Sequence, residues 1–321
     1  MSDIILHRGS FEDAEVSLVE RLALTGLSTS SRLLEPTHFK GYGRIAAVLR
    51  RAAPRRHIML KLNNDCNFRF PFGDSYWSRL LAPSVVYEPE MLSLYQLIRD
   101  EDYCLVDCGA NFGYWSVLVT GAGLGSHTAI AIEASGRNVA ELKQNAARNA
   151  ERFEVVHAAV ADVDGGFVTL GGPTHEGLAI VDAVQAGPNA EQAPRISLDG
   201  LLSRSALLQG SPRIVLKLDV EGVEEAALKG APQMLARDTL LIYEEQGSEQ
   251  QHANTRFVTQ ELGMCVFVYA RGAFHEARDP LSEVAAMKQN PRRGYNVVAT
   301  RSETWLQILR RSARPNVQRA A

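Results

Sequence analysis

The chain is poor in the features that mark several protein classes. It has four cysteines in 321 residues, and none are paired at C-x-x-C spacing, so neither a disulfide framework nor a cysteine-rich zinc site is expected. No window reaches the run of about 18 uncharged apolar residues that a membrane-spanning helix needs. Acidic residues interrupt the N-terminal segment where a signal peptide would be apolar. We therefore expect a cytoplasmic protein without a transmembrane segment.

A strong charge of either sign is also lacking. The formal net charge is −3, from 34 Lys and Arg against 37 Asp and Glu residues, so no overall basic field favours nucleic acid. Hydrophobic residues make up 45% and charged residues 22% of the chain, which is typical of globular domains and excludes collagen-like, coiled-coil and wholly disordered classes. We expect no nucleic-acid partner.

Apolar runs alternate with helical patterns only in the second part of the chain. From Tyr103 onward, short strands are followed by helices at the spacing of β-α-β units, which predicts a parallel sheet with right-handed connections. Seven strands fit this pattern. We place a boundary near Asp100, which gives an N-terminal extension of helices and a β-hairpin (1–100), an α/β domain (101–301), and a C-terminal helix with a basic tail (302–321).

A polar loop follows the first strand of this series. It contains Asp107, Gly109, Asn111 and Gly113 as D-x-G-x-N-x-G, and glycines at such a turn let the backbone approach a ligand closely. Glu133 ends the next strand, where a carboxylate can accept hydrogen bonds from both ribose hydroxyls. Together these residues predict a site for a nucleoside that carries an amino-acid arm.

A second motif, K-L-D-V-E-G, ends the strand that begins at Arg213. Period-two alternation places Lys217 and Asp219 on one face, and an interior lysine in a covered parallel strand needs a charged partner. The carboxyl ends of such strands border the ligand crevice. We therefore assign catalysis to Lys217, Asp219 and Glu221, with Asp219 also close to the cofactor; helix capping is the alternative role for Glu221.

These motifs have a recognisable order. DCGANFGYWS, IEAS, LKQNAARN, KLDVEGVEEAALKGA and LLIYEE, over about residues 105–246, resemble the FkbM-type family of S-adenosylmethionine-dependent O-methyltransferases. The resemblance implies a class I methyltransferase (Rossmann-like) fold, with a seven-stranded sheet whose last strand is antiparallel. It also implies S-adenosyl-L-methionine as cofactor and methyl transfer to a hydroxyl of a small molecule or glycan, such as a sugar or polyketide.

Two other functions compete with this interpretation. An NAD(P)-dependent oxidoreductase would need glycines at positions 109, 111 and 114, but Asn111 and Tyr114 occupy two of them. A cofactor-binding scaffold without catalysis is the other alternative, and the intact Lys217, Asp219 and Glu221 argue against it. We expect no bound metal, although Asp219, Glu221 and Glu244 could together offer oxygen ligands to a divalent ion.

One stretch of the extension is strongly basic. Seven basic residues follow one another without an intervening acid: Lys40, Arg44, Arg50, Arg51, Arg55, Arg56 and Lys61. Such a run is usually a solvated face. The alternative is a contact with an anionic partner, such as a membrane surface, an anionic glycolipid or an acidic polysaccharide.

Overall fold

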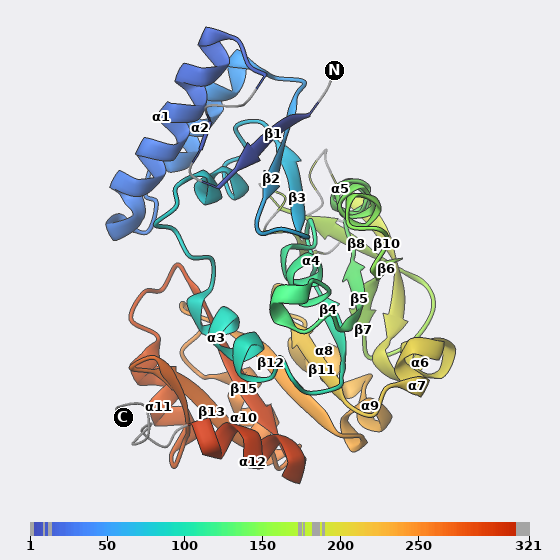
Figure 1. Cartoon of the computed structure of the whole chain (residues 1–321). Coiled ribbons are helices and arrows are strands. Elements are labelled where there is room, and N and C mark those ends of the chain that lie inside the picture. The colour runs from blue at the N-terminus through green and yellow to red at the C-terminus, as the bar shows by residue number, and fades with distance from the viewer. Residues whose placement is uncertain are drawn as a thin grey trace.

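The computed structural model describes residues 3–312, except 9, 12–14, 173–174, 176, 182–186 and 188–189. The expected basic tail, 313–321, lies outside the described residues. The expected mixed α/β fold with one large sheet is confirmed: the sheet has eight strands in the order β14-β13-β15-β12-β11-β4-β5-β6 (Figure 1). In that order the strands are Ala273–Glu276, Cys265–Ala270, Gly294–Thr300, Thr239–Gln246, Ile214–Leu218, Cys104–Cys108, Thr128–Glu133 and Phe153–His157.

Direction divides this sheet into two parts. β12, β11, β4, β5 and β6 are parallel to one another. β15 runs antiparallel to both β12 and β13, and β14 forms an antiparallel pair with β13. The sheet therefore has one strand more than the seven expected, because the chain after β13 turns back at Arg271 and Gly272, both with positive φ, instead of becoming irregular.

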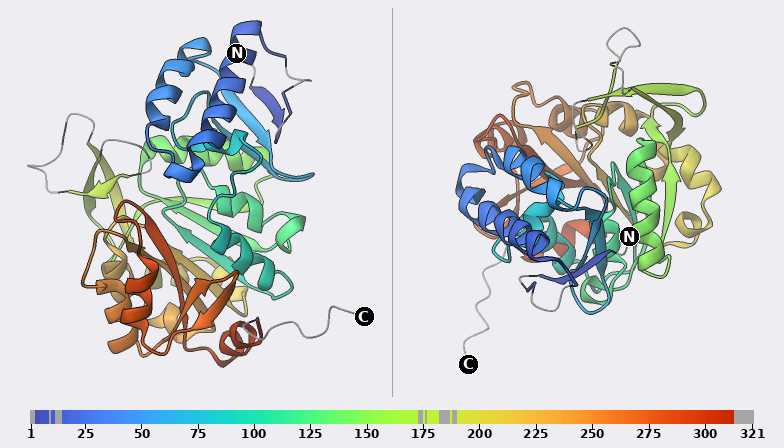
Figure 2. Two further views of the ribbon diagram at one scale, coloured as in Figure 1. Left: turned by 90° about the vertical axis from the view of Figure 1, so that its left-hand side faces the viewer. Right: turned by 90° about the horizontal axis from the view of Figure 1, so that it is seen from above.

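Helices cover both faces of the sheet (Figure 2). Alternate strand residues enter two apolar clusters: Leu105 and Val215 belong to one cluster, and Val106 and Leu216 to the other. The first face packs against helices α4 (Tyr114–Val119), α5 (Gly136–Arg148) and α12 (Glu303–Ser312). The second face packs against α6 (Leu198–Arg204), α7 (Ala206–Gly210), α8 (Glu224–Lys229), α9 (Pro232–Ala236), α10 (Ala253–Gln260) and α11 (Pro280–Met287).

A second sheet of four strands follows β6, in the order β7-β10-β8-β9. Its strands are Ala159–Ala161, Glu191–Ser197, Phe167–Gly171 and Ala179–Ile180. β7 and β10 are parallel, whereas β8 is antiparallel to both β10 and β9. The segment between β6 and β11, which we call the excursion, thus forms a separate small sheet beside the ends of the parallel strands.

The N-terminal extension holds a third sheet and three α-helices. Its strands β1 (Ile4–His7), β2 (His57–Lys61) and β3 (Asn67–Pro71) form a sheet in which β1 and β2 are parallel and the expected hairpin β2–β3 is antiparallel. Its helices are α1 (Leu18–Leu34), α2 (Tyr42–Leu49) and α3 (Pro89–Leu97), with short 3-10 turns at Glu35–Thr37, Arg50–Ala52 and Trp77–Leu81. A further 3-10 turn, Ala122–Leu124, follows α4.

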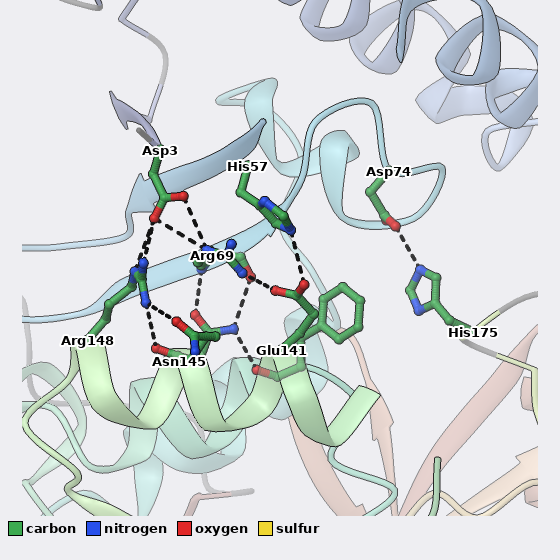
Figure 3. Close-up of polar contacts among 10 residues, drawn as sticks. Asp3, His57, Arg69, Asp74, Glu141, Asn145, Arg148 and His175 are labelled. Atoms are coloured by element: carbon green, nitrogen blue, oxygen red, sulfur yellow. Dashed lines mark hydrogen bonds and ion pairs between the residues drawn. The ribbon is translucent and has the colours of Figure 1, made fainter. Parts of the chain in front are cut away.

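Helix α5 completes the open edge of β3 (Figure 3). The side-chain amide of Asn145 accepts a hydrogen bond from the Arg69 N–H (2.6 Å) and donates one to the Arg69 carbonyl (2.9 Å). One turn later, Asn149 makes the same pair of bonds with Asn67, at 2.9 and 2.7 Å. Four helical residues rise about 6 Å and two strand residues about 6.6 Å, so the two spacings match.

Ion pairs flank this amide ladder. Arg69 lies between Asp3 and Glu141, and Glu141 also contacts His57 Nε2 at 3.0 Å. Arg148 binds Asp3 at 2.7 Å. The extension is therefore held on α5 by both backbone pairing and charge.

Helical periodicity in the sequence predicts helices over residues 12–25 and 221–236, and the structure differs from the expected bounds of both. α1 starts at Leu18 instead of residue 12, because Ser17 and Glu20 form a reciprocal capping box. The helix expected over residues 221–236 is broken into α8 and α9, because Gly222 has a positive φ and Pro232 begins a new helix after Gly230. Glu221 consequently lies in a turn before α8, with φ 52°, and not in a helix.

Candidate active site

A cleft that opens to solvent lies at the carboxyl ends of β4, β5 and β11. The extension, the parallel strands and the four-stranded sheet all contribute to its lining. Of the eight site positions expected from the sequence, all but Gly113 line it: Asp107, Gly109, Asn111, Glu133, Lys217, Asp219 and Glu221. Gly113 instead precedes α4, where a Cβ would overlap the side chain of Leu142.

Lys217 is the centre of the charged end of this cleft. Its ammonium lies 3.0 Å from Asp219 Oδ2 and 3.7 Å from Asp107 Oδ1. Asp107 is the lateral neighbour of Lys217 across the β4–β11 pair, and Lys217 is only 3% exposed. Burial lowers the pKa of Lys217, but Asp219, Asp107 and Glu88 outweigh burial and leave it raised. The carboxylates around the lysine therefore favour its charged, protonated form.

The loop after β4 closely approaches the end of β11. Gly109 has φ 76°, and a Cβ there would overlap the carbonyl oxygen of Asp219, which explains why glycine is needed. Asp107 is buried and accepts a hydrogen bond from Ser116 Oγ at 2.7 Å. Burial raises the pKa of Asp107, whereas Lys217 acts to lower it.

Glu133 lies at the other end of the cleft. Its Oε2 accepts the N–H of Asn111 and its Oε1 the N–H of Ser135, both at 2.8 Å. Burial raises the pKa of this carboxyl, while these N–H donors act to lower it. The Asn138 side chain and the N–H of Ala134 also act to lower this pKa, so several protein donors face the carboxylate at the wall of the cleft. Beside it, Ala134, Ala159, Leu170, Leu178 and Ile180 form an apolar slot.

Asn111 joins three parts of the chain at the rim of the cleft. Its Oδ1 accepts hydrogen bonds from its neighbour Phe112 N (2.9 Å) and from Trp77 Nε1 in the extension (3.0 Å). Its Nδ2 donates to the carbonyl of His175, in the excursion, at 3.2 Å. The His175 ring stacks on Phe112 and its Nε2 lies 2.8 Å from Asp74 Oδ2 (Figure 3). The side-chain amide of Asn111 is thus occupied by protein groups, while its residue still lines the cleft.

The acids that follow β11 have different surroundings. Glu221 is half-buried and accepts a long hydrogen bond from Gln246 at 3.4 Å. Glu224 is buried and accepts the N–H groups of Val220 and Gly222, at 3.3 and 3.2 Å. Glu224 therefore stabilises the turn between β11 and α8, whereas Glu221 lines the cleft.

The extension supplies groups that sequence reasoning did not assign. Tyr76, Trp77 and Tyr87 line the cleft with Trp115 of α4. Trp115 Nε1 donates to Glu88 Oε2 at 2.6 Å. Burial, together with Asp219, raises the pKa of Glu88 to about 7, although Lys217 acts to lower it. No motif marks Glu88 in the sequence; only the fold brings it to Lys217.

Two groups of acids bear on metal binding. Among the described residues, the one set of three His, Cys, Asp or Glu side chains with ligand atoms within 4.8 Å of one another is Glu245, Glu249 and His252. The ammonium of Lys288 lies among them, 3.4 Å from Glu245 Oε2 and 3.1 Å from His252 Nδ1. The ammonium of Lys288 therefore supplies the positive charge among these three side chains. Asp219, Glu221 and Glu244 do not gather within the same distance, and burial raises the pKa of Glu244 well above its usual range.

Comparison with known protein families gives a match to the α/β part of the chain. Residues 107–279 match the family model of the FkbM methyltransferase domain, which is more than half of the 321 residues. No curated protein matches the chain. Among solved structures, the FkbM methyltransferase of Methylobacillus flagellatus is similar with a TM-score of 0.39 and 16% identity, over 62% of this chain and 43% of that one.

Two further solved structures are similar to the chain. Precorrin-6y C5,15-methyltransferase from Geobacter metallireducens has a TM-score of 0.36 and 11% identity, over 68% of this chain and 90% of that one. Pyrococcus horikoshii TYW2, solved in complex with MeSAdo, has a TM-score of 0.33 and 13% identity, over 84% of this chain and 85% of that one.

Proposed function

This chain belongs to the FkbM family of methyltransferases, and we propose that it is an S-adenosyl-L-methionine-dependent O-methyltransferase of class I fold. The proposed acceptor is a hydroxyl of a sugar, glycan or other small molecule. The observation that carries the proposal is that a buried carboxylate, Glu133, and a buried ammonium, Lys217, line the same cleft. The cofactor, when bound, supplies the methyl group from its sulfonium.

The proposed cofactor fits the residues at the Glu133 end. The carboxylate of Glu133 ends a parallel strand and lines the cleft, which suits the ribose hydroxyls, and the apolar slot suits the adenine. The loop of Asp107, Gly109 and Asn111, with Gly113 shaping its end, and Asp219 would border the amino-acid arm. An NAD(P)-dependent oxidoreductase is less well supported, because the loop lacks two of the three fingerprint glycines.

The other end of the cleft fits an acceptor with hydroxyl groups. Tyr76, Trp77 and Tyr87 offer flat apolar surfaces, and Lys217, Asp219 and Glu221 offer polar groups beside them. Such a mixture suits a ring that has apolar faces and a polar edge, as a sugar does. We propose that residues 1–100 act mainly in acceptor recognition, and residues 101–301 in cofactor binding and catalysis.

Proton transfer can be divided among the charged groups. Lys217 remains protonated because of the carboxylates around it, so it orients the acceptor oxygen and does not remove its proton. Asp219 holds the lysine in place at 3.0 Å. The proposed proton acceptor is Glu88, which bonds the cleft residue Trp115 and follows the cleft residue Tyr87. Its pKa of about 7 suits this role, because general bases work best near the working pH. Glu221 would contact the acceptor from the opposite loop.

Cofactor binding gives the direct test of the proposal. In calorimetry, S-adenosylhomocysteine should bind and NAD(P) should not. Glu133→Ala should weaken S-adenosylhomocysteine binding by about 1.5 to 3 kcal/mol, the range for hydrogen bonds to a charged group. Glu154→Ala, which removes an exposed acid on β6, serves as the matched control. Unchanged affinity in Glu133→Ala would refute the ribose assignment.

We also propose that methyl transfer needs no metal ion. Treatment with EDTA should leave the turnover rate unchanged in an assay with radiolabelled cofactor. Activity that is lost with EDTA and restored by magnesium would instead assign Asp219, Glu221 and Glu244 as ligands.

A further inference from the structure

The outer face of helix α1 is apolar where a surface helix is usually polar. The helix buries Ala23, Leu24 and Leu27 on its inner side, yet Leu18 is 73% and Leu22 65% exposed, and Val19 and Leu33 are exposed as well. At about 100° per residue, Leu18, Leu22 and Leu33 lie on the side of the helix away from its buried stripe, and Val19 lies at the border between the two. Single exposed leucines are common, but a row of them marks an interaction surface.

Helix α2 extends this apolar face. α1 and α2 form an antiparallel hairpin at one end of the molecule (Figures 1 and 2). They meet at Gly26, whose Cβ position lies 3.1 Å from the side chain of Leu49. Leu22 is one turn from Gly26, and the neighbour of Leu49, Val48, is 59% exposed. Together the outward side chains form a surface that we call the apolar ridge: Leu18, Val19, Leu22, Leu33, Ile45 and Val48.

The segment that carries the apolar ridge is rich in exposed cations and almost lacks acids. The exposed basic side chains are Arg32, Lys40, Arg44, Arg50, Arg51 and Arg55. Between Val16 and Lys61 the chain has two acids, Glu20 and Glu35, and Glu20 is buried in an ion pair with Arg56 at 2.9 Å. This local positive charge stands against a net charge of −3 for the whole chain.

We propose that the α1–α2 hairpin docks on the surface of an anionic lipid membrane. Apolar side chains that project beyond a flank of Lys and Arg are the pattern of helices that lie in the membrane interface. Among the described residues no helix is long and apolar enough to cross a membrane, so the contact is with the surface. Pairing of this face with that of a second copy would bring like charges together, which favours lipid as the occupant.

The proposal is independent of the methyl-transfer chemistry, because none of the ridge residues lines the cleft. It can therefore be tested by co-sedimentation of the full chain with vesicles, without an acceptor. Vesicles of phosphatidylcholine alone should not bind the protein, whereas vesicles with an equal amount of phosphatidylglycerol should. Binding should weaken at about 1 M salt, where the Debye length falls to about 3 Å.

Two pairs of variants separate the apolar and charged contributions. Leu22→Asp with Val48→Asp should weaken vesicle binding at least about tenfold, by loss of apolar insertion. Arg44→Glu with Arg51→Glu should weaken vesicle binding at least about tenfold, because each basic residue close to an anionic membrane surface adds to the binding free energy. The matched controls are Val163→Asp with Phe167→Asp, and Arg271→Glu with Arg278→Glu; all four are exposed far from the ridge in sequence.

Three results would overturn the proposal. One is equal binding to both kinds of vesicle. Another is binding that is unchanged by either variant pair, or lowered as much by the controls. The third is a lipid-free dimer that Leu22→Asp with Val48→Asp converts to a monomer in sedimentation velocity, since a second copy would then be the occupant.

Discussion

At the scale of single residues, the proposed chemistry of this protein depends on one ammonium with more than one carboxylate. Lys217 contacts Asp219 and, across the strand pair, Asp107, and it also lowers the pKa of Glu88. A buried charge with several opposite partners is held in one position. The acceptor hydroxyl would therefore meet a fixed positive charge beside a group that can take its proton.

Substitution of Lys217 tests its role. Lys217→Met should lower kcat by about 100-fold or more. S-adenosylhomocysteine affinity measured by calorimetry should change little, because the proposed site for most of the cofactor lies near Glu133. The loss of a buried ion-pair partner should also lower the free energy of unfolding by about 3 to 5 kcal/mol. Denaturation should thus be measured beside the kinetics. A folded Lys217→Met protein with full activity would show that the lysine is only structural.

Glu88 should make the reaction depend on pH. Its carboxyl must lose a proton to act as a base, so kcat should rise as the pH rises through about 7. Glu88→Gln should remove this rise and lower kcat by about 100-fold or more, with cofactor affinity retained. Because the pKa is raised in the folded state, the free energy of unfolding should fall between pH 4.5 and about 7, and less so in Glu88→Gln. An unchanged pH profile in the variant would contradict the assignment.

The sequence predicted part of this cleft, because several of its residues occupy equivalent positions at the ends of strands. Asp107, Glu133 and Asp219 all end or follow parallel strands, and such strand ends meet at one edge of a sheet. Glu88 and Trp115 could not be predicted in the same way. Glu88 lies in an irregular segment before α3, where neither periodicity nor a motif shows which strand it will approach.

At the scale of secondary-structure elements, two asparagines at the C-terminal end of α5 stabilise the edge of β3. Asn145 and Asn149 supply amides to the outer edge of β3, at positions where a neighbouring strand would otherwise pair. Helical periodicity predicted α5, and the turn residues at 63–65 predicted the β2–β3 hairpin. That the two elements pair was not predictable, because the contact joins residues 76 and 82 positions apart through side chains that are usually exposed.

Removal of the Asn145 side-chain hydrogen bonds should show how much the contact between α5 and β3 stabilises the protein. Asn145→Ala deletes the hydrogen bonds to Arg69 N, Arg69 O and Phe112 O, and it leaves buried backbone groups without partners. The free energy of unfolding should fall by about 2 to 4 kcal/mol in urea denaturation. Lys143→Ala, an exposed position on the same helix, should change it by less than about 0.5 kcal/mol. Equal stabilities of the two variants would mean that the ladder contributes little.

At the scale of the whole molecule, the extension and the sheet share one apolar core. Leu24 and Phe68 of the extension belong to the same cluster as Leu105 and Val215 of the sheet. The sequence suggested a boundary near Asp100 because the β-α-β pattern begins there. It could not show how closely the two parts are packed, since the packing is made by side chains that look like ordinary core residues in either part.

A shared core should give cooperative unfolding. We expect a single transition in scanning calorimetry of the full chain without cofactor, with the extension and the sheet melting together. Limited proteolysis during the scan should cut residues 1–100 and 101–301 over the same temperature range. Two separate transitions, with the extension cut first, would show that the two parts fold as independent units.

The pairing of α5 with β3 also imposes an order on folding during synthesis. Asn145 is made 76 residues after Arg69, which at about 5 to 20 residues per second takes about 4 to 15 s. In that interval β1, β2 and β3 can pair with one another, but the outer edge of β3 stays open to strands of other nascent chains. The growing chain is thus most exposed to misassembly on the ribosome until the helix that follows Glu133 has formed.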